Sequence, residues 1–451
     1  MPRMWLEKGE KVIMDRSNEI LVLGGGLAGS EAAWQLAQRG YPVCLVEMRP
    51  KITTPAHQTD MMGELVCSNS LGADNMTSPA GILKAELRYL GSLIMEAADH
   101  TSVPAGKALA VDRDAFAGYI TKKLSEHPCI RIERREMTSL PEEPAIIATG
   151  PLTSPSLAEE LKKITGEEYF SFFDAIAPVV FYDSIDMTKA YKAGRYGQEA
   201  DYINCPMNEE EYIRFWNALV SAERATRHEF EKDIRYFEGC LPIEVIASRG
   251  IDTLRFGPLR PVGLPNPLTG EEPYAVVQLR QDNKDGTLFN LVGFQTSLKW
   301  GEQARVFKLI PGLQDAEFAR YGVMHRNIYV NAPTVLDGFL RLRDRKNLFL
   351  AGQITGVEGY LESTAMGLVA AIYMAFSLRQ TEMPIWPKET AIGSLLRYLS
   401  ETDTKVFHPM NVNLGIFPRL DVKIRKKIER CQKVGERAML FLEEFYKSYL
   451  K

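Results

Sequence analysis

The feature that most constrains this chain is a glycine-rich turn between two apolar segments near its start. Residues 19–47 read EILVLGGGLAGSEAAWQLAQRGYPVCLVE. Gly24-x-Gly26-x-x-Gly29 opens a helical stretch after the first apolar segment, and Glu47 ends the second. Glycines at this spacing permit a tight turn, a close approach of the backbone to a pyrophosphate and close packing of helix on strand. Because an acid at the end of the second strand can accept hydrogen bonds from a ribose, the pattern predicts a dinucleotide-binding α/β unit.

A second glycine-rich stretch lies far along the chain. Residues 347–353 read NLFLAGQ, an apolar segment that runs into a glycine turn, and GVEGYLESTAMG follows at 356–367. A helix that begins there would point unpaired N–H groups toward the rest of a flavin. Two glycine sites indicate FAD, and without a second GxGxxG any NAD(P)H is expected to dock transiently. The predicted cofactor-binding residues are Gly24, Gly26, Leu27, Ala28, Gly29, Glu47, Arg49, Gly150, Gly352, Gly356, Gly359 and Tyr360.

Length and composition predict a globular protein of two domains. The chain has 451 residues, 45% hydrophobic and 25% charged, and no run of 18 apolar residues, so no membrane span is expected. The apolar stretch 365–378 is predicted to be a buried helix. We expect an N-terminal extension (1–16), a Rossmann-like FAD-binding domain (17–190 and 331–451) and an inserted α/β domain (191–330). The predicted fold class is α/β, and the FAD-binding domain is expected to be of the GR2 flavoprotein type.

Cysteine and histidine usage narrows the chemistry. Six cysteines are widely spaced without a CxxC pair, which argues against a disulfide scaffold, a zinc ribbon or a dithiol reductase and favours a reducing, cytoplasmic compartment. Six histidines form no HxH or HExxH pair, so no bound metal is expected. The net charge of −4 does not decide whether nucleic acid is a partner, because a local basic patch can serve on an acidic molecule.

The chain resembles the folate- and FAD-dependent tRNA (uracil-5-)-methyltransferases, the TrmFO family, over nearly all of its length after residue 16. A larger flavoprotein relative that modifies wobble uridines shares the fold but is usually much longer at its C-terminus. The stretches that carry the resemblance are VLGGGLAGSEAAWQLAQRG, TPAHQTD, GELVCSNSL, DYINCPMNEEEY, FEGCLPIEVIASRG, LRFGPLRPVGL, NLVGFQTSLKWGEQ, YGVMHRN, AGQITGVEGY and PMNVNLGIFP.

The resemblance implies a chemistry that matches the reactivity of uracil. Cys240, in FEGC, would add as a thiolate to C6 of the T-loop uridine at tRNA position 54, which makes C5 nucleophilic. The carbon would come from 5,10-methylenetetrahydrofolate, with reduced flavin carrying the methylene and supplying the hydride, and NAD(P)H reducing the flavin again. Cys67, in GELVCSNSL, matches a second family cysteine that shields the flavin or helps to remove the C5 proton. Against both assignments, a free cysteine is commonly a small buried side chain.

Contacts to tRNA must come from local basic surfaces, since the T-loop uridine has to be flipped out before C6 can be reached. A row of basic residues at helical spacing is, however, also typical of a solvated helix face. Two departures from the family pattern, Gly72 after SNSL and Gln58 after His57, put the detail of the substrate pocket in question, and His57 is a pocket candidate with a structural alternative. The RNA-binding candidates are Arg255, Arg260, Arg343, Arg345, Lys346, Lys426 and Lys427.

Three alternatives to tRNA methylation stay open at this point. The same chemistry on ribosomal RNA would use every motif above. A plain NAD(P)H-dependent flavin oxidoreductase explains both glycine motifs but leaves Cys240 and the inserted domain without a role. A flavin-stabilised RNA-binding protein would bind FAD without folate-dependent turnover. No protein partner is predicted.

Overall fold

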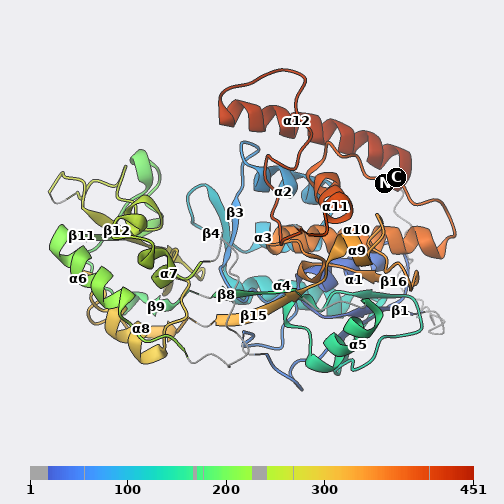
Figure 1. Cartoon of the computed structure of the whole chain (residues 1–451), viewed down its shortest axis with the longest axis horizontal. Helices are drawn as coiled ribbons and strands as arrows, with labels where there is room; N and C mark the ends of the chain where they lie inside the picture. Colours follow the sequence, from blue (N-terminus) through green and yellow to red (C-terminus); the bar gives the residue numbers. More distant parts are fainter. Residues whose placement is uncertain are drawn as a thin grey trace.

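The computed structural model divides into two units, each with its own hydrophobic core (Figure 1). One core is built from the N-terminal and C-terminal parts of the chain, and the other from residues between Val180 and Ala316. The structure describes residues 19–54, 56–165, 170–175, 177–225, 241–267, 269–322, 324–405 and 407–451.

The first unit is organised by a parallel five-stranded sheet. The strand order is β16-β7-β1-β2-β6. The short apolar sequences of β1, β2, β7 and β16 suit a sheet that is covered on both faces, whereas the edge strand β6 is charged and half-buried. The α/β fold class predicted from the two glycine motifs is confirmed. The strands are β1 (Ile20–Leu23), β2 (Val43–Glu47), β6 (Ile130–Arg134), β7 (Ala145–Ile147) and β16 (Leu348–Leu350).

Helix α1 (Leu27–Gln38) packs directly against α10 (Tyr360–Leu378), so the two glycine motifs lie side by side although they are far apart in sequence. Glycines make this approach possible. A Cβ atom on Gly29 would lie 1.8 Å from the carbonyl oxygen of Gly24, and one on Gly367 would lie 2.2 Å from that of Ala28.

Helix α10 is the one described helix that is long and apolar enough to cross a membrane, but 83% of its most hydrophobic stretch is buried. It is therefore the central helix of the first unit, in agreement with the buried helix predicted at 365–378. Further elements cover this unit (Figure 1). They are β3 (Ser70–Ala73), α2 (Pro79–Tyr89), α3 (Leu93–His100), β4 (Ser102–Val103), β5 (Ala108–Val111), α4 (Arg113–Glu126), α5 (Pro155–Thr165), α9 (Ala332–Val335), α11 (Ala391–Glu401) and α12 (Lys427–Phe445).

The second unit carries a six-stranded sheet in the order β10-β11-β12-β13-β9-β14. Every pairing within it is antiparallel. The strands are β9 (Val179–Phe181), β10 (Tyr191–Lys192), β11 (Tyr202–Met207), β12 (Ala275–Gln281), β13 (Leu288–Leu291) and β14 (Phe318–Arg320), and the helices are α6 (Glu209–Val220), α7 (Ile243–Ser248) and α8 (Trp300–Phe307).

This sheet begins earlier than the predicted domain boundary at residue 191, because β9 belongs to it. The chain passes between the units along two paired antiparallel strands, β8 (Phe170–Ala175) and β15 (Met324–Tyr329). They lie at the centre of Figure 1. The boundary was predicted from a change of composition near residue 192, and a three-residue strand upstream of that change leaves no such signal.

Candidate functional site

A long groove runs past the carboxyl ends of β1, β2, β7 and β16, which is where open α/β sheets bind ligands. It contains about 1020 Å³ of empty space, including the open solvent at its mouth. The predicted cofactor residues that line it are Gly24, Gly26, Leu27, Ala28, Glu47, Arg49, Gly150, Gly352 and Tyr360.

The groove walls fit a dinucleotide such as FAD. No atom lies within 4 Å of the position that a Cβ would take on Gly26 or on Gly150, so a ligand can approach the backbone at both residues. Gly26 also precedes α1, whose first N–H groups suit a pyrophosphate. Bound there, a dinucleotide would have the apolar side chains of Leu27, Leu152 and Leu157 beside it.

Three of the predicted cofactor residues are not among those that line the groove, and each has a packing reason to be glycine. Gly29 faces the backbone of Gly24, as described above. Gly356 has a φ of +91° and a Cβ there would lie 2.4 Å from the ring of Phe407. Gly359 has a φ of +119° and a Cβ there would lie 2.2 Å from the carboxylate of Glu362.

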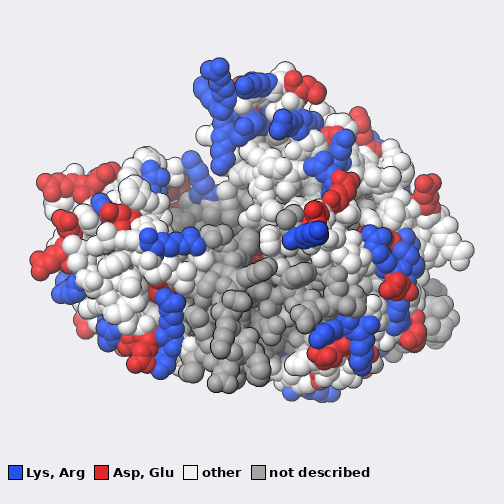
Figure 2. Space-filling model, viewed as in Figure 1, with Lys and Arg blue, Asp and Glu red and all other residues white. Residues whose placement is uncertain are grey.

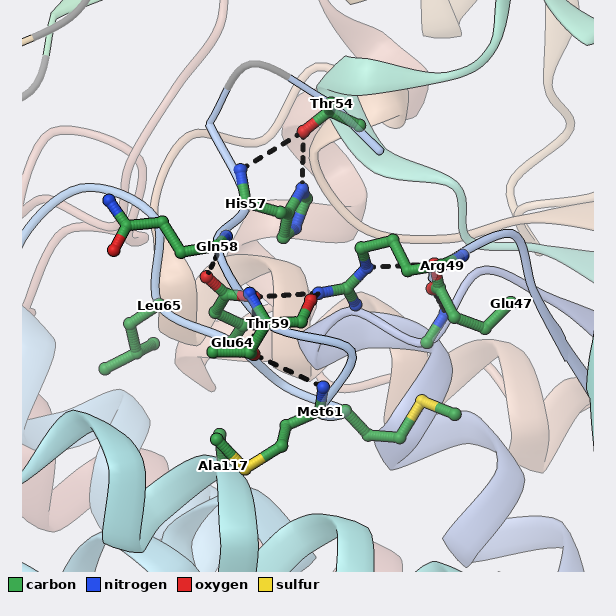
Figure 3. A network of polar contacts seen from close by, with 12 residues as sticks. Glu47, Arg49, Thr54, His57, Gln58, Thr59, Met61, Glu64, Leu65 and Ala117 are labelled. Atoms are coloured by element: carbon green, nitrogen blue, oxygen red, sulfur yellow. Dashed lines mark hydrogen bonds and ion pairs between the residues drawn. The ribbon is translucent and has the colours of Figure 1, made fainter. Parts of the chain in front are cut away.

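Glu47 is held firmly at the end of β2 (Figure 3). Its Oε2 accepts the Gly25 N–H at 2.7 Å, and its Oε1 accepts the backbone N–H and the Nε of Arg49, each at 2.9 Å. Burial would raise the pKa of Glu47, but the bonds and the charge of Arg49 outweigh it and hold the pKa below its usual value. A carboxylate has about four acceptor positions, so about one is left for a ribose hydroxyl.

Arg49 holds the neighbouring loop as well as Glu47 (Figure 3). Its Nη1 lies 2.9 Å from Glu64 Oε2, and Glu64 in turn accepts the backbone N–H groups of Gln58 and Thr59. His57 lines the groove, and its Nδ1 lies 2.7 Å from Thr54 Oγ1. Burial, with the charge of Arg49, lowers the pKa of His57 to about 4, so the imidazole is neutral at physiological pH.

Cys67 lines a second, smaller pocket. Glu64 and Val66 line the groove, whereas Cys67 and Ser68 line the pocket, so one short segment contributes to both cavities. The Cys67 N–H donates to Tyr360 Oη at 2.7 Å, and Tyr360 lines the groove at the start of α10.

The small pocket lies between the two units, and we call it the interunit pocket. Cys67 and Ser68 come from the first unit, and most of the other lining residues come from β12, β13 and the segment after β13. Its lining residues are Cys67, Ser68, Ala177, Arg280, Asn290, Leu291, Val292, Gly293 and Gln295.

Cys240 lies outside the described residues, but the chain directly after it is anchored beside the interunit pocket. The Ile243 N–H donates to the backbone oxygen of Gln295 at 2.7 Å. The buried carboxylate of Glu244 accepts Thr296 Oγ1 at 2.9 Å and the Ser297 N–H at 2.7 Å. Residues 243 and 244 are thus fixed to the segment that contributes Gln295 to the pocket.

An arginine cluster surrounds this junction, and sequence reasoning missed it. Arg113 contacts Asp282 and the backbone oxygens of Leu65 and Cys67. Arg320 has buried Nε and Nη2 atoms without a hydrogen-bond partner in the described part of the chain. Burial and the charge of Arg113 lower the pKa of Arg320, while Asp282, Tyr360 and Cys67 act in the opposite direction. No local motif surrounds Arg113 or Arg320, so only the fold could have identified them.

The predicted RNA-binding residues of the second unit lie on one short segment. Arg255 stacks on Tyr274, with its guanidinium carbon 3.6 Å from the ring centre, and forms an ion pair with Asp252 at 2.8 Å. Arg260 is exposed. Neither residue is close in the chain to the interunit pocket lining, and both stay predictions.

The basic residues at 343–346 are used by the protein itself. Arg343 donates to the backbone oxygens of Thr334 and Pro333, Arg345 donates to that of Pro141 at 2.6 Å, and Lys346 lies 3.3 Å from an Asp337 oxygen. By contrast, Lys426 and Lys427 are exposed and form no ion pair with any described residue. Figure 2 shows Lys and Arg gathered at the end of α12 that lies nearest the second unit.

The comparisons with known proteins agree with this geometry. The family model described as glucose inhibited division protein A (GIDA) matches residues 19–382. A protein of Listeria monocytogenes serotype 4b named "Methylenetetrahydrofolate--tRNA-(uracil-5-)-methyltransferase TrmFO" is 59% identical over 93% of this chain and 96% of its own length. The chain belongs to the TrmFO family. A TrmFO of Desulforamulus reducens is 56% identical over 95% of this chain and 97% of its own length.

Among solved structures, GidA of Aquifex aeolicus shares the fold. Its form I crystal structure superimposes with a TM-score of 0.66 at 19% identity and covers 95% of this chain, which in turn covers 77% of the GidA chain. The relatives at 56–59% identity confirm the resemblance to the TrmFO family, and the longer GidA chain shares the fold.

The groove predicts a selective effect of the substitution Gly26→Ala. An added methyl group meets no protein atom within 4 Å but enters the groove, so folding should be normal while FAD binding weakens by tenfold or more, since overpacking a contact typically costs about 1–3 kcal/mol. FAD titration by flavin fluorescence measures this, with Gly301→Ala, at an exposed site, as the control. Equal FAD affinity in both variants would contradict the placement of the cofactor.

Proposed function

We propose that this chain transfers the carbon of 5,10-methylenetetrahydrofolate to C5 of a uracil in tRNA, with FAD bound in the groove. The observation that supports it best is that the segment 64–68 contributes lining residues both to the groove and to the interunit pocket. A redox cofactor in one site and a flipped base in the other would face each other across Cys67. The names of relatives at 56–59% identity state the same activity for those proteins.

The residues have separable roles in this proposal. Gly24, Gly26, Gly150 and the start of α1 would hold the phosphates of FAD, and Glu47 would accept one ribose hydroxyl. When bound and reduced, the flavin would supply the two electrons that convert the methylene carbon to a methyl group, and we assign NAD(P)H as the external reductant of the flavin. The neutral His57 and the apolar groove lining would keep water away from the reacting carbon.

We assign Cys240 as the nucleophile and Cys67 as its partner across the interunit pocket. Uracil C5 gains nucleophilic character only when a thiolate adds at C6, and the proton at C5 must leave after the new carbon–carbon bond forms. Cys67 belongs to the other unit and lines the pocket, where its thiol can take up that proton or shield the flavin. The guanidinium groups of Arg113, Arg280 and Arg320 would provide a positive field that favours the anionic forms of the cysteine thiol and of the uracil base.

A plain flavin oxidoreductase needs only the groove. The interunit pocket, with one family cysteine in its lining and the chain after the other anchored beside it, argues for chemistry on a third molecule. Ribosomal RNA as that molecule uses the same residues and is separated from tRNA by the assay below.

The assay combines FAD, NADPH, labelled methylenetetrahydrofolate and an unmodified tRNA transcript. We expect label on the T-loop uridine with wild-type protein and none with Cys240→Ala, while the variant keeps its FAD absorbance. Equal NADPH oxidation by both proteins without label in tRNA would contradict the proposal. The assay would then be repeated with ribosomal RNA fragments. Label in these fragments would indicate an rRNA methyltransferase, and its absence would favour a plain flavin oxidoreductase.

The surface contact to RNA is proposed for a cationic segment that covers the start of α12 and the residues before it. It contains Lys423, Arg425, Lys426, Lys427 and Arg430. All five side chains are exposed. They lie at the end of the helix nearest the second unit, so a tRNA held there can reach toward the interunit pocket (Figures 1 and 2). Cations of this kind bind phosphates without regard to sequence and make the affinity salt-dependent.

Lys426→Glu/Lys427→Glu should weaken binding of an unmodified tRNA transcript by tenfold or more. Loss of two phosphate contacts should also reduce the slope of log K against log salt concentration by about 1–2. Filter binding at several salt concentrations measures both quantities. Lys346→Glu is the control because Lys346 already faces Asp337. The same affinity loss in the control, or an unchanged slope in the double variant, would rule out the α12 contact.

A further inference from the structure

The polar side chains of the interunit pocket are nearly all committed to one another. Arg280 Nη2 donates to Ser68 Oγ at 2.6 Å, and its Nε donates to Asn69 Oδ1 at 3.1 Å. Asn290 Nδ2 donates to Asn69 Oδ1 and to Asp282 Oδ1, each at 3.0 Å. These bonds hold the side chains of Ser68, Arg280 and Asn290 in fixed positions in the pocket lining.

Gln295 is the exception. Its side chain lines the pocket and is only partly buried, and its amide forms no hydrogen bond with any described residue. Its backbone is nonetheless fixed, because its carbonyl oxygen accepts the Ile243 N–H at 2.7 Å and the next two residues hold the carboxylate of Glu244. A rigid backbone with an uncommitted amide is the arrangement expected of a group that recognises a ligand.

The amide of Gln295 has the chemistry of a uracil reader. A primary amide presents an oxygen acceptor beside N–H donors. The Watson–Crick edge of uracil presents the N3–H donor beside the O4 acceptor, and enzymes that flip a base read this edge by hydrogen bonds. Since Ile243 follows Cys240 by three residues and is bonded to Gln295, a base held by the amide lies close to the chain that carries the nucleophile.

We propose that Gln295 binds the N3–H and O4 edge of the target uracil in the interunit pocket, which rests on the proposed function. Its carbonyl oxygen accepts N3–H and its amino group donates to O4. When the thiolate adds to C6, the electron pair of the 5,6 double bond moves toward O4, and the amino group stabilises the enolate oxygen that results. The enolate then returns the electron pair to C5, and C5 attacks the methylene carbon.

The test compares Gln295→Glu, Gln295→Ala and the control Gln314→Glu, which changes an exposed glutamine of the second unit in the same way. A carboxylate has no donor for O4 and repels the enolate, so Gln295→Glu should lower kcat/KM for tRNA methylation by about 100-fold or more, as does loss of one donor to a developing oxyanion. Gln295→Ala should lose about 10-fold to 100-fold. Both variants should keep the FAD content and thermal midpoint of the wild type.

The pH dependence separates recognition from structure. A protonated glutamic acid regains a donor, so the activity of Gln295→Glu relative to wild type should rise as pH falls from about 8 to about 5.5, toward the range in which carboxyl groups take up protons. Gln295→Ala should show no such recovery. The inference would be overturned if both Gln295 variants had the activity of the wild type. It would also be overturned if they lost activity and FAD content together and Gln295→Glu did not recover at low pH. Absence of tRNA methylation by the wild type would instead reject the proposed function.

Discussion

The arrangement of the site depends on the guanidinium group of Arg113. Its Nε pairs with Asp282 of the second unit at 2.9 Å, while Nη1 and Nη2 donate to the backbone oxygens of Leu65 and Cys67 at 2.6 and 2.7 Å. Burial would raise the pKa of Asp282, but the charge of Arg113 and its hydrogen bond hold it below the usual value. Removing one partner of such a buried pair typically costs about 3–5 kcal/mol, so the contact ties the units together and fixes the wall segment at once.

The segment that Arg113 fixes is shared by the two cavities. Residues 64–68 contribute lining residues to the groove and to the interunit pocket. Tyr360, at the start of α10, accepts the Cys67 N–H, so the second glycine motif supports the same segment. The segment that lines both cavities is therefore held from both units.

Much of the first unit could be predicted from sequence because its signals are local. The glycine spacing after β1 and the apolar segments at β7 and β16 predict where three strands of the parallel sheet end, without knowledge of the fold. The same locality explains why nine predicted residues line the groove. Gly29, Gly356 and Gly359 show its limit, because a glycine required for packing looks the same in sequence as one required for a ligand.

The interunit pocket could not be predicted in the same way. Arg113, Arg280 and Asp282 lie in stretches without a local motif. Gln295 lies in a stretch that resembles the family, but nothing in that stretch assigns it to a pocket. These residues meet only because β12 and β13 are brought against the segment after Glu64. The basic residues show the same effect: Arg343, Arg345 and Lys346 form a convincing cluster in sequence, yet the fold uses them to hold backbone oxygens and Asp337. Charge patterns indicate where cations are, and only the structure shows which are available.

The proposed role of Cys240 is tested most directly by trapping the covalent intermediate and identifying the cysteine that attacks the base. A tRNA transcript with 5-fluorouridine in the T loop should accumulate as a covalent adduct, because the fluorine at C5 cannot leave as a proton does. Proteolysis and mass spectrometry of the trapped complex locate the attachment. We expect the nucleotide on the peptide that contains Cys240. Attachment at Cys67, or no adduct from a preparation that methylates unmodified tRNA, would contradict it.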